Sequence, residues 1–126
     1  MGVVYATIKL SNPVMSDSVP IEVQCFVESG ATYLCIPPHL ADQLQLQELQ
    51  KREVTLAEGS SILVPYVGPI KVEYANRLCF VGAMVLDDQT LLGAIPMEDM
   101  DLVILPKLFQ LSVNPESPNV AHGLAK

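Results

Sequence analysis

Basic residues are scarce in this sequence, and that scarcity limits the partners the protein can bind. Lysine and arginine together number 7 against 14 acidic residues, which leaves a formal net charge of −7. A nucleic-acid partner requires a basic patch, and the longest basic cluster here is Lys51-Arg52. We therefore expect no nucleic-acid partner. The same acidity disfavours binding to an anionic membrane surface.

Long hydrophobic runs are also missing. No apolar run reaches the length of a transmembrane helix, and residues 1–5 lack the features of a signal peptide. The three cysteines, Cys25, Cys35 and Cys79, are odd in number and lie in apolar surroundings without metal-ligand spacing. We therefore expect a cytoplasmic protein with free thiols, no membrane partner, no bound metal and no cofactor.

Alternating apolar residues indicate that most of the chain is extended. Half of the 126 residues are apolar and 17% are charged, which is typical of a folded domain with a core. A period of two over residues 4–10 and 21–27 predicts two strands. Shorter apolar or alternating runs predict further strands at residues 34–36, 53–56, 61–66, 70–74, 78–86, 102–105 and 108–113.

Glycine and proline mark the connections between these strands. Residues 57–60 predict a hairpin with a glycine-bearing tip, and Gly68-Pro69 predicts a turn into the next strand. Pro38 and Pro96 each predict the start of a short helix, because proline suits the first helical turn.

Residues 1–113 therefore predict a small, mostly β barrel or sandwich. The apolar run 102–105 predicts a strand covered on both faces. Residues 114–126 are rich in proline, asparagine and serine, and we expect an extended arm or tail without a core of its own.

One loop combines chemically useful side chains. In Glu28-Ser29-Gly30-Ala31, a carboxylate and a hydroxyl stand together at the end of a predicted strand. The glycine that follows can adopt backbone conformations that other residues resist. In isolation, the pattern is equally typical of an ordinary turn with a solvated glutamate.

The order of three features resembles the retropepsin-like aspartic proteases, the single-domain relatives of retroviral proteases. The acid–hydroxyl–Gly–Ala loop precedes the glycine-tipped hairpin, and Leu91-Leu92-Gly93 precedes a short helix. Residues 54–59, 64–69 and 91–96 look similar to the small prokaryotic branch of that clan, and the likeness extends from about Pro20 to Asn119. The resemblance implies a small closed β-barrel with a flap hairpin and one or two short helices.

The resemblance also implies a role for each residue of the loop. Glu28 falls where the family has its catalytic aspartate. Ser29 matches a hydroxyl residue that braces two such loops across a dimer, and Gly30 and Ala31 match the residues that let the backbone approach the partner loop. By the same resemblance, Glu58-Gly59-Ser60 forms the tip of a flap over the substrate.

A single loop implies a homodimer. Two carboxylates about 3 Å apart cannot both ionise, so they share one proton. The ionised group takes a proton from water and the protonated group donates to the peptide carbonyl. Because this chain carries one such loop, a two-fold dimer must supply the second carboxylate, with an extended peptide or protein substrate across the axis.

Glu28 departs from the aspartate of the family, so two hypotheses follow. The extra methylene adds roughly 1.5 Å of reach, which crowds or splays a pair of carboxylates at an axis. The first hypothesis is a homodimeric aspartic endopeptidase in which Glu28 serves catalysis. The second is a non-catalytic dimeric module that binds a peptide or a partner protein on the same fold.

Other chemistry is disfavoured by the sequence context. Neither His39 nor His122 lies in a triad pattern, and Cys35 within an apolar run is typical of a core residue. Asp87-Asp88 and Glu98-Asp99-Asp101 lack the spacing of a calcium loop and predict solvated turn acids. Lys51-Arg52 predicts a solvated pair.

Overall fold

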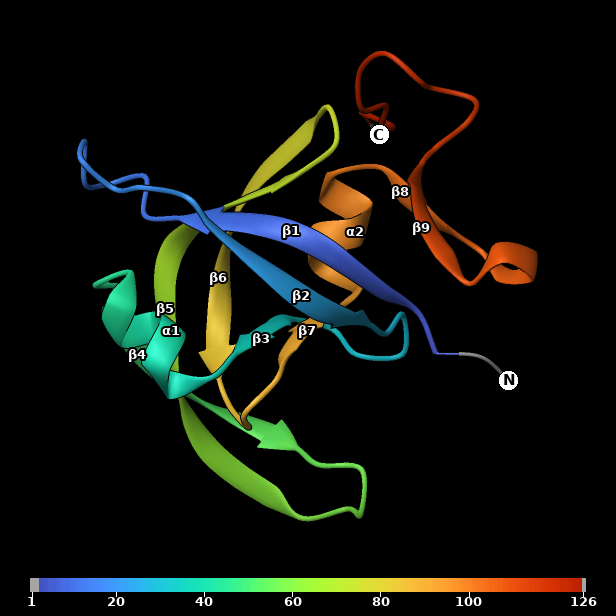
Figure 1. The fold of residues 1–126 in the computed structure, drawn as a ribbon. Coiled ribbons are helices and arrows are strands. Elements are labelled where there is room, and N and C mark those ends of the chain that lie inside the picture. Colours follow the sequence, from blue (N-terminus) through green and yellow to red (C-terminus); the bar gives the residue numbers. More distant parts are fainter. Residues whose placement is uncertain (1–2, 126) are drawn as a thin grey trace.

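The first strand closes the sheet into a barrel because both of its edges are paired. In the computed structural model, which describes residues 3–125, β1 (Tyr5–Ser11) runs antiparallel to β2 (Ile21–Val27) and to the second half of β5 (Ser61–Tyr74). The six strands follow one another around the barrel in the order β1, β2, β7 (Thr90–Leu92), β3 (Leu34–Ile36), β6 (Arg77–Val85) and β5 (Figure 1). The expected mostly β closed barrel is confirmed.

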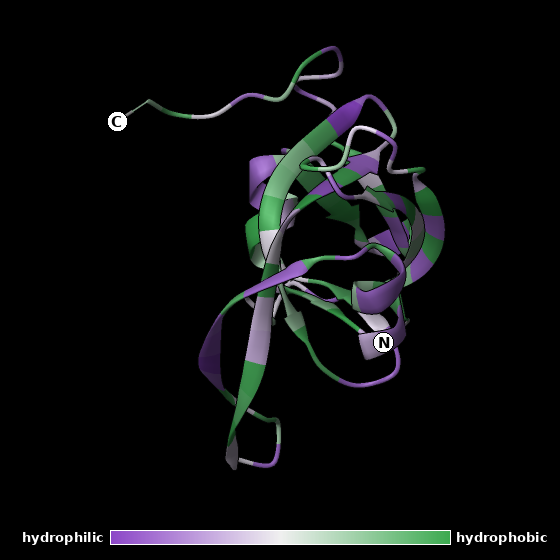
Figure 2. Cartoon of the chain, turned by 90° about the vertical axis from the view of Figure 1, so that its left-hand side faces the viewer, coloured by the Kyte–Doolittle hydropathy of each residue, from purple (hydrophilic) through white to green (hydrophobic). Residues whose placement is uncertain are grey.

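The glycine-tipped hairpin projects from this barrel. Of the described strands, β4 (Gln47–Thr55) pairs with β5 alone, in a register that ends at Thr55 opposite Ser61. The turn contains Gly59, whose φ of 100° favours glycine. Figure 2 shows the two strands as an arm that extends below the barrel and carries both hydrophilic and hydrophobic segments. Both strands are longer than the sequence pattern predicts.

The predicted turn at Gly68-Pro69 is wrong, because β5 continues through both residues as far as Tyr74. The pairing of β5 with β6 shifts register between Val67 and Ile70, which is a β-bulge. A bulge leaves a residue outside the ladder, so it tolerates a proline that lacks an N–H group. Gly68 has a φ of 151° there and packs closely against Gly82.

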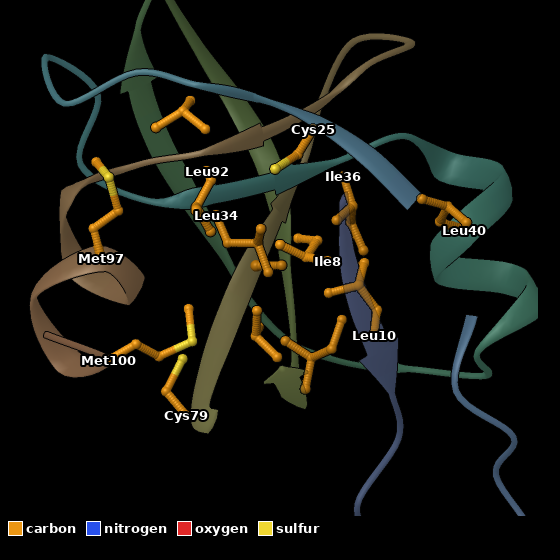
Figure 3. Close-up of a cluster of buried hydrophobic side chains, with 14 of the residues drawn as sticks. Ile8, Leu10, Cys25, Leu34, Ile36, Leu40, Cys79, Leu92, Met97 and Met100 are labelled. Carbon is orange, nitrogen blue, oxygen red and sulfur yellow. The ribbon is translucent and has the colours of Figure 1, made fainter. Parts of the chain in front are cut away.

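The core fills the barrel and extends to both helices (Figure 3). Ile8 and Leu10 point inward from β1 and are 1% and 0% exposed. Met97 and Met100, from α2 (Ala94–Asp99) and its end, approach the same cluster. Burial of each large apolar side chain stabilises the fold by about 1.5–3 kcal/mol. The methionines are therefore core residues.

Both predicted helices are present. The first, α1 (Pro38–Gln43), starts at the expected proline and buries Leu40 and Ala41. The second, α2, starts two residues before Pro96. Neither helix within residues 3–125 has the length and hydropathy to cross a bilayer.

A second, two-stranded sheet follows the barrel. It pairs β8 (Leu102–Leu105) with β9 (Gln110–Val113), and the short 3-10 helix η1 (Pro106–Leu108) joins them. The expected burial of both faces of β8 is wrong: Leu102 is buried, but the rest of the strand is partly exposed. This small sheet lies beside the barrel, and Leu102 and Leu111 join the core. It is not enclosed between two other layers, so one of its faces stays partly exposed.

The segment after β9 is held in place although it has no helix or strand. The carboxylate of Asp101 accepts hydrogen bonds from the Asn114 amide, the Ser117 hydroxyl and the His122 main-chain N–H. The buried Arg77 guanidinium donates to the Ser117 carbonyl and lies 4.0 Å from Asp101 Oδ2. The arm is therefore attached to the barrel as far as residue 122.

Candidate functional site

The Glu28 loop connects β2 to β3 and crosses the end of β7, which lies between these two strands in the sheet. Strand β7 pairs in parallel with β2 and antiparallel with β3, with Val27 opposite Leu92 and Cys35 opposite Leu91. The Glu28 N–H donates to the Leu92 carbonyl at 3.0 Å, which continues the β2–β7 ladder by one residue. The position of Glu28 is thus fixed by the barrel.

The Glu28 side chain folds back over its own loop. Its Oε1 accepts a hydrogen bond from the Gly30 N–H at 2.9 Å, and its main-chain carbonyl accepts one from the Ala31 N–H at 3.2 Å. Glu28 is partly buried, whereas Ser29 and Gly30 are exposed. The exposed Ser29 hydroxyl and Gly30 are open to a second molecule.

Gly93 allows the start of α2 to pack directly on this loop. A Cβ at Gly93 would lie 2.4 Å from the Tyr33 carbonyl oxygen and 2.8 Å from that of Ala31. Next to it, the N–H groups of Ala94 and Ile95 donate to the carbonyls of Ala31 and Thr32 at 2.8 and 2.9 Å. The segment Leu91-Leu92-Gly93 therefore packs against the loop and limits its movement.

A pocket of about 810 Å³ opens beside Glu28. The loop contributes Glu28, Gly30 and Ala31 to its lining, but not Ser29, and the hairpin contributes the stretch from Glu53 to Ala57. Apolar side chains form much of the remaining lining, namely Phe26, Met84, Leu86 and Leu91. This volume is in the range of pockets that hold small molecules or segments of peptide.

The proposed flap tip lies just beyond the pocket. The wall supplied by the hairpin stops at Ala57, one residue before Glu58-Gly59-Ser60. These three residues are exposed, and the Ser60 hydroxyl and N–H both donate to the Glu58 carboxylate. In this single chain the tip is therefore a self-contained turn, and the end of β4 lines the pocket.

Arg52 links the base of the hairpin to the loop, which the sequence did not reveal. Its guanidinium carbon lies 3.8 Å from the centre of the Tyr66 ring and 5.7 Å from that of Tyr33. The Gln50 amide oxygen, once turned toward Arg52, accepts from its Nε and Nη2 at 2.8 and 3.0 Å. Of the predicted solvated pair, Lys51 is exposed but Arg52 is partly buried, so the interpretation of Arg52 is wrong.

Two turn acids also belong to the pocket. Asp87 and Asp88 follow the end of β6 and are exposed, as expected, but both also line the pocket. Their place in the sequence, directly before the strand β7 that supports the Glu28 loop, is the signal that would have pointed to them.

The thiols are poor nucleophiles in this fold. Burial raises the pKa of Cys25 to about 11 and that of Cys79 to about 12. Burial, together with the negative charge of Asp87, raises the pKa of Cys35 to about 11. Cys35 lines the pocket, whereas His39 is exposed on α1. Among residues 3–125, no group of three or more potential metal ligands comes together.

Comparison with known proteins does not assign the chain to a family. No protein-family model matches the chain. A search of curated proteins returns no significant match.

Proposed function

We propose that the protein is an aspartic-type endopeptidase that acts as a homodimer, with one Glu28 carboxylate from each copy. The observation that carries the proposal is the Glu28 carboxylate, which the Gly30 N–H holds at 2.9 Å beside a pocket of about 810 Å³. The loop is braced by Leu92 and Gly93, and Ser29 and Gly30 remain exposed for a second loop. The order of these motifs resembles retropepsin-like proteases.

The chemistry follows from two carboxylates at a two-fold axis. When the two carboxylates are about 3 Å apart, they share one proton, and the apparent pKa values describe the pair and not either residue alone. The ionised carboxylate removes a proton from water, and the water oxygen attacks the peptide carbonyl. The protonated carboxylate donates its proton to the carbonyl oxygen, which gives a tetrahedral intermediate. The C–N bond then breaks as the carboxyl group that took the proton from water passes it to the leaving amine, and a hydroxyl of the intermediate returns its proton to the other carboxylate. An extended substrate binds across the axis between the two hairpins.

The test combines the native mass with an assay of peptide cleavage at mildly acidic pH. We expect a dimer that cleaves peptides, and we expect a statine-type transition-state mimic to inhibit it. Glu28→Gln removes the ionisable group and is expected to abolish cleavage, whereas the matched Glu98→Gln, on the exposed face of α2, is expected to cleave normally. A monomer in solution, or a Glu28→Gln variant with full activity, would contradict the proposal.

A second candidate is a non-catalytic dimeric module that binds an extended peptide or a partner protein. The glutamate at position 28 favours it, because displacement of a catalytic group by ~1 Å costs on the order of a hundredfold in rate. In that case no peptide is cleaved, and Glu28→Gln binds its partner as well as or better than the parent protein because the repulsion between like charges is gone.

A further inference from the structure

The pocket beside Glu28 is lined by acidic residues from three separate segments of the chain. Glu53 comes from β4, Asp87 and Asp88 come from the connection between β6 and β7, and Glu28 lies at the loop. Within the described chain, no lysine, arginine or histidine lines this pocket. The ion pairs of residues 3–125 involve other acids, namely Glu48, Glu73 and Asp101. The four carboxylates of the pocket are therefore not neutralised by the protein.

Apolar residues form much of the remaining lining, together with a few uncharged polar ones such as Thr32 and Gln89. Phe26 and Leu91 lie on the neighbouring strands β2 and β7, and Met84 lies on β6. A ligand side chain that suits a pocket with both apolar residues and carboxylates has an apolar stem and a positive head, which describes lysine and arginine. A ligand side chain with a carboxylate would meet like charges in the same pocket.

The pocket also lies beside an open strand edge. Strand β4 is last in the order of the sheet, and its residues Glu53 to Thr55 line the pocket. An unpaired strand edge offers N–H and C=O groups to an extended peptide, whose alternate side chains then point to one face. The occupant that satisfies the edge and the pocket together is a peptide segment with a basic side chain.

We propose that this pocket selects extended peptides that carry lysine or arginine next to the bond held at the Glu28 loop. The inference rests on the proposed function, because it treats the pocket as the peptide site of that function. Two-fold symmetry repeats the acidic residues in the second copy, so a basic residue on each side of the central bond binds better than one alone.

The experiment measures binding of fluorescent decapeptides that carry a non-cleavable hydroxyethylene unit at the centre and differ only in the flanking residue. We expect the lysine peptide to bind about tenfold more tightly than the glutamine peptide, and the glutamate peptide to bind more weakly than both. Raising the salt from 50 to 500 mM is expected to reduce the advantage of lysine, because salt screens exposed charges.

Matched variants assign the preference to the acidic residues of the pocket. The double variant Asp87→Asn and Asp88→Asn, and separately Glu53→Gln, are expected to reduce the ratio of the affinities for the lysine and glutamine peptides. Asp87 has a φ of 63°, a conformation that asparagine accepts as readily as aspartate, so the substitution preserves the turn. Asp42→Asn, on the exposed surface of α1, is the control and keeps the full preference.

The outcomes separate this inference from the proposed function. Equal binding of the lysine and glutamate peptides, or an unchanged preference in the pocket variants, overturns the inference even if the protein cleaves peptides. Lysine-selective binding without cleavage of any unmodified peptide supports the inference and overturns the protease proposal. If no peptide binds, both are wrong.

Discussion

The main-chain N–H of Gly30 donates to the carboxylate of Glu28 at 2.9 Å, so the side chain is anchored to its own loop. Aspartate side chains commonly form a turn of this kind, in which the carboxylate accepts a hydrogen bond from the main-chain N–H two residues later. Here the longer glutamate makes the same contact by folding back. The carboxylate is therefore held close to its main chain, despite the additional methylene.

The first prediction concerns Glu28→Asp. Aspartate makes the same contact with Gly30 without folding back, and its side chain is shorter by roughly 1.5 Å. Two aspartates at the axis avoid the crowding expected of two glutamates, so we expect cleavage to become faster by on the order of a hundredfold. The measurement is kcat/KM for one peptide at equal dimer concentration. A slower Asp variant would show that the site is adapted to glutamate.

The second prediction concerns Gly93→Ala. The backbone of Gly93 is extended, with φ of −94° and ψ of −169°, so alanine adopts it without strain. The added Cβ overlaps the Tyr33 carbonyl oxygen at 2.4 Å, and a main-chain atom cannot rotate away. We expect a loss of about 3 kcal/mol in the free energy of unfolding, measured by urea denaturation.

The control for this prediction is Gly123→Ala, where the added Cβ meets nothing within 4 Å. It is expected to change stability by less than about 0.5 kcal/mol. Equal stability of Gly93→Ala and the parent protein would mean that the loop moves away from α2 at little cost.

The third prediction concerns Arg52 as the link between the hairpin and the barrel. Arg52→Ala removes the cation from the Tyr66 ring, a contact worth about 1 kcal/mol at a partly exposed site. We expect amides of β4 to exchange with deuterium roughly fivefold faster as a result. Arg52→Lys keeps the charge but loses the planar stacking, so its exchange rate is expected to lie between those of the parent protein and Arg52→Ala. Lys51→Ala is the control, because Lys51 forms only an exposed ion pair with Glu48.

The fourth prediction concerns the pH dependence of the C-terminal arm. The Ser117 hydroxyl, with smaller contributions from the His122 N–H and the Asn114 amide, lowers the pKa of Asp101 from 3.8 to about 2. A carboxylate with a lower pKa in the folded state stabilises the fold above its unfolded pKa, and this stabilisation is lost as the pH falls. The parent protein is therefore expected to lose stability between about pH 4 and pH 2 to a greater extent than Asp101→Asn.

Asparagine tolerates the left-handed conformation of Asp101, whose φ is 55°. Asp99→Asn, exposed on α2, serves as the control and is expected to follow the parent protein. Identical pH profiles for the parent and Asp101→Asn would show that the hydrogen bonds to the arm do not favour the ionised carboxylate.

The fifth prediction concerns the thiols. Cys25 and Cys79 are 0% and 2% exposed, so we expect a thiol reagent to modify them only after unfolding. Cys35 is partly exposed at the pocket and is expected to react slowly at neutral pH and faster as the pH rises toward its pKa of about 11. A bound peptide should protect Cys35, which mass spectrometry of the labelled protein can measure. Rapid labelling of Cys79 in the folded protein would contradict the buried core.

The sequence alone determined most of the strands, both helices and the order of the loops, but it did not predict the strand β7 or the continuation of β5 through Gly68-Pro69. The period of two in residues 4–10 and 21–27 arises because one face of each strand is buried, and that pattern is local. The helix that starts at Pro38 and the glycine-bearing hairpin tip depend likewise on neighbouring residues. Glu28, which directly follows β2, could also be identified from the local sequence.

Only the tertiary structure decided which distant segments meet. The closure of β1 on β5 and the position of β7 between β2 and β3 depend on hydrogen bonds between residues far apart in the chain. The same holds for Arg52 near the Tyr33 ring and for Asp101 against the C-terminal arm. These contacts form because burial of the shared core brings the segments together, and no local pattern of residues encodes that arrangement.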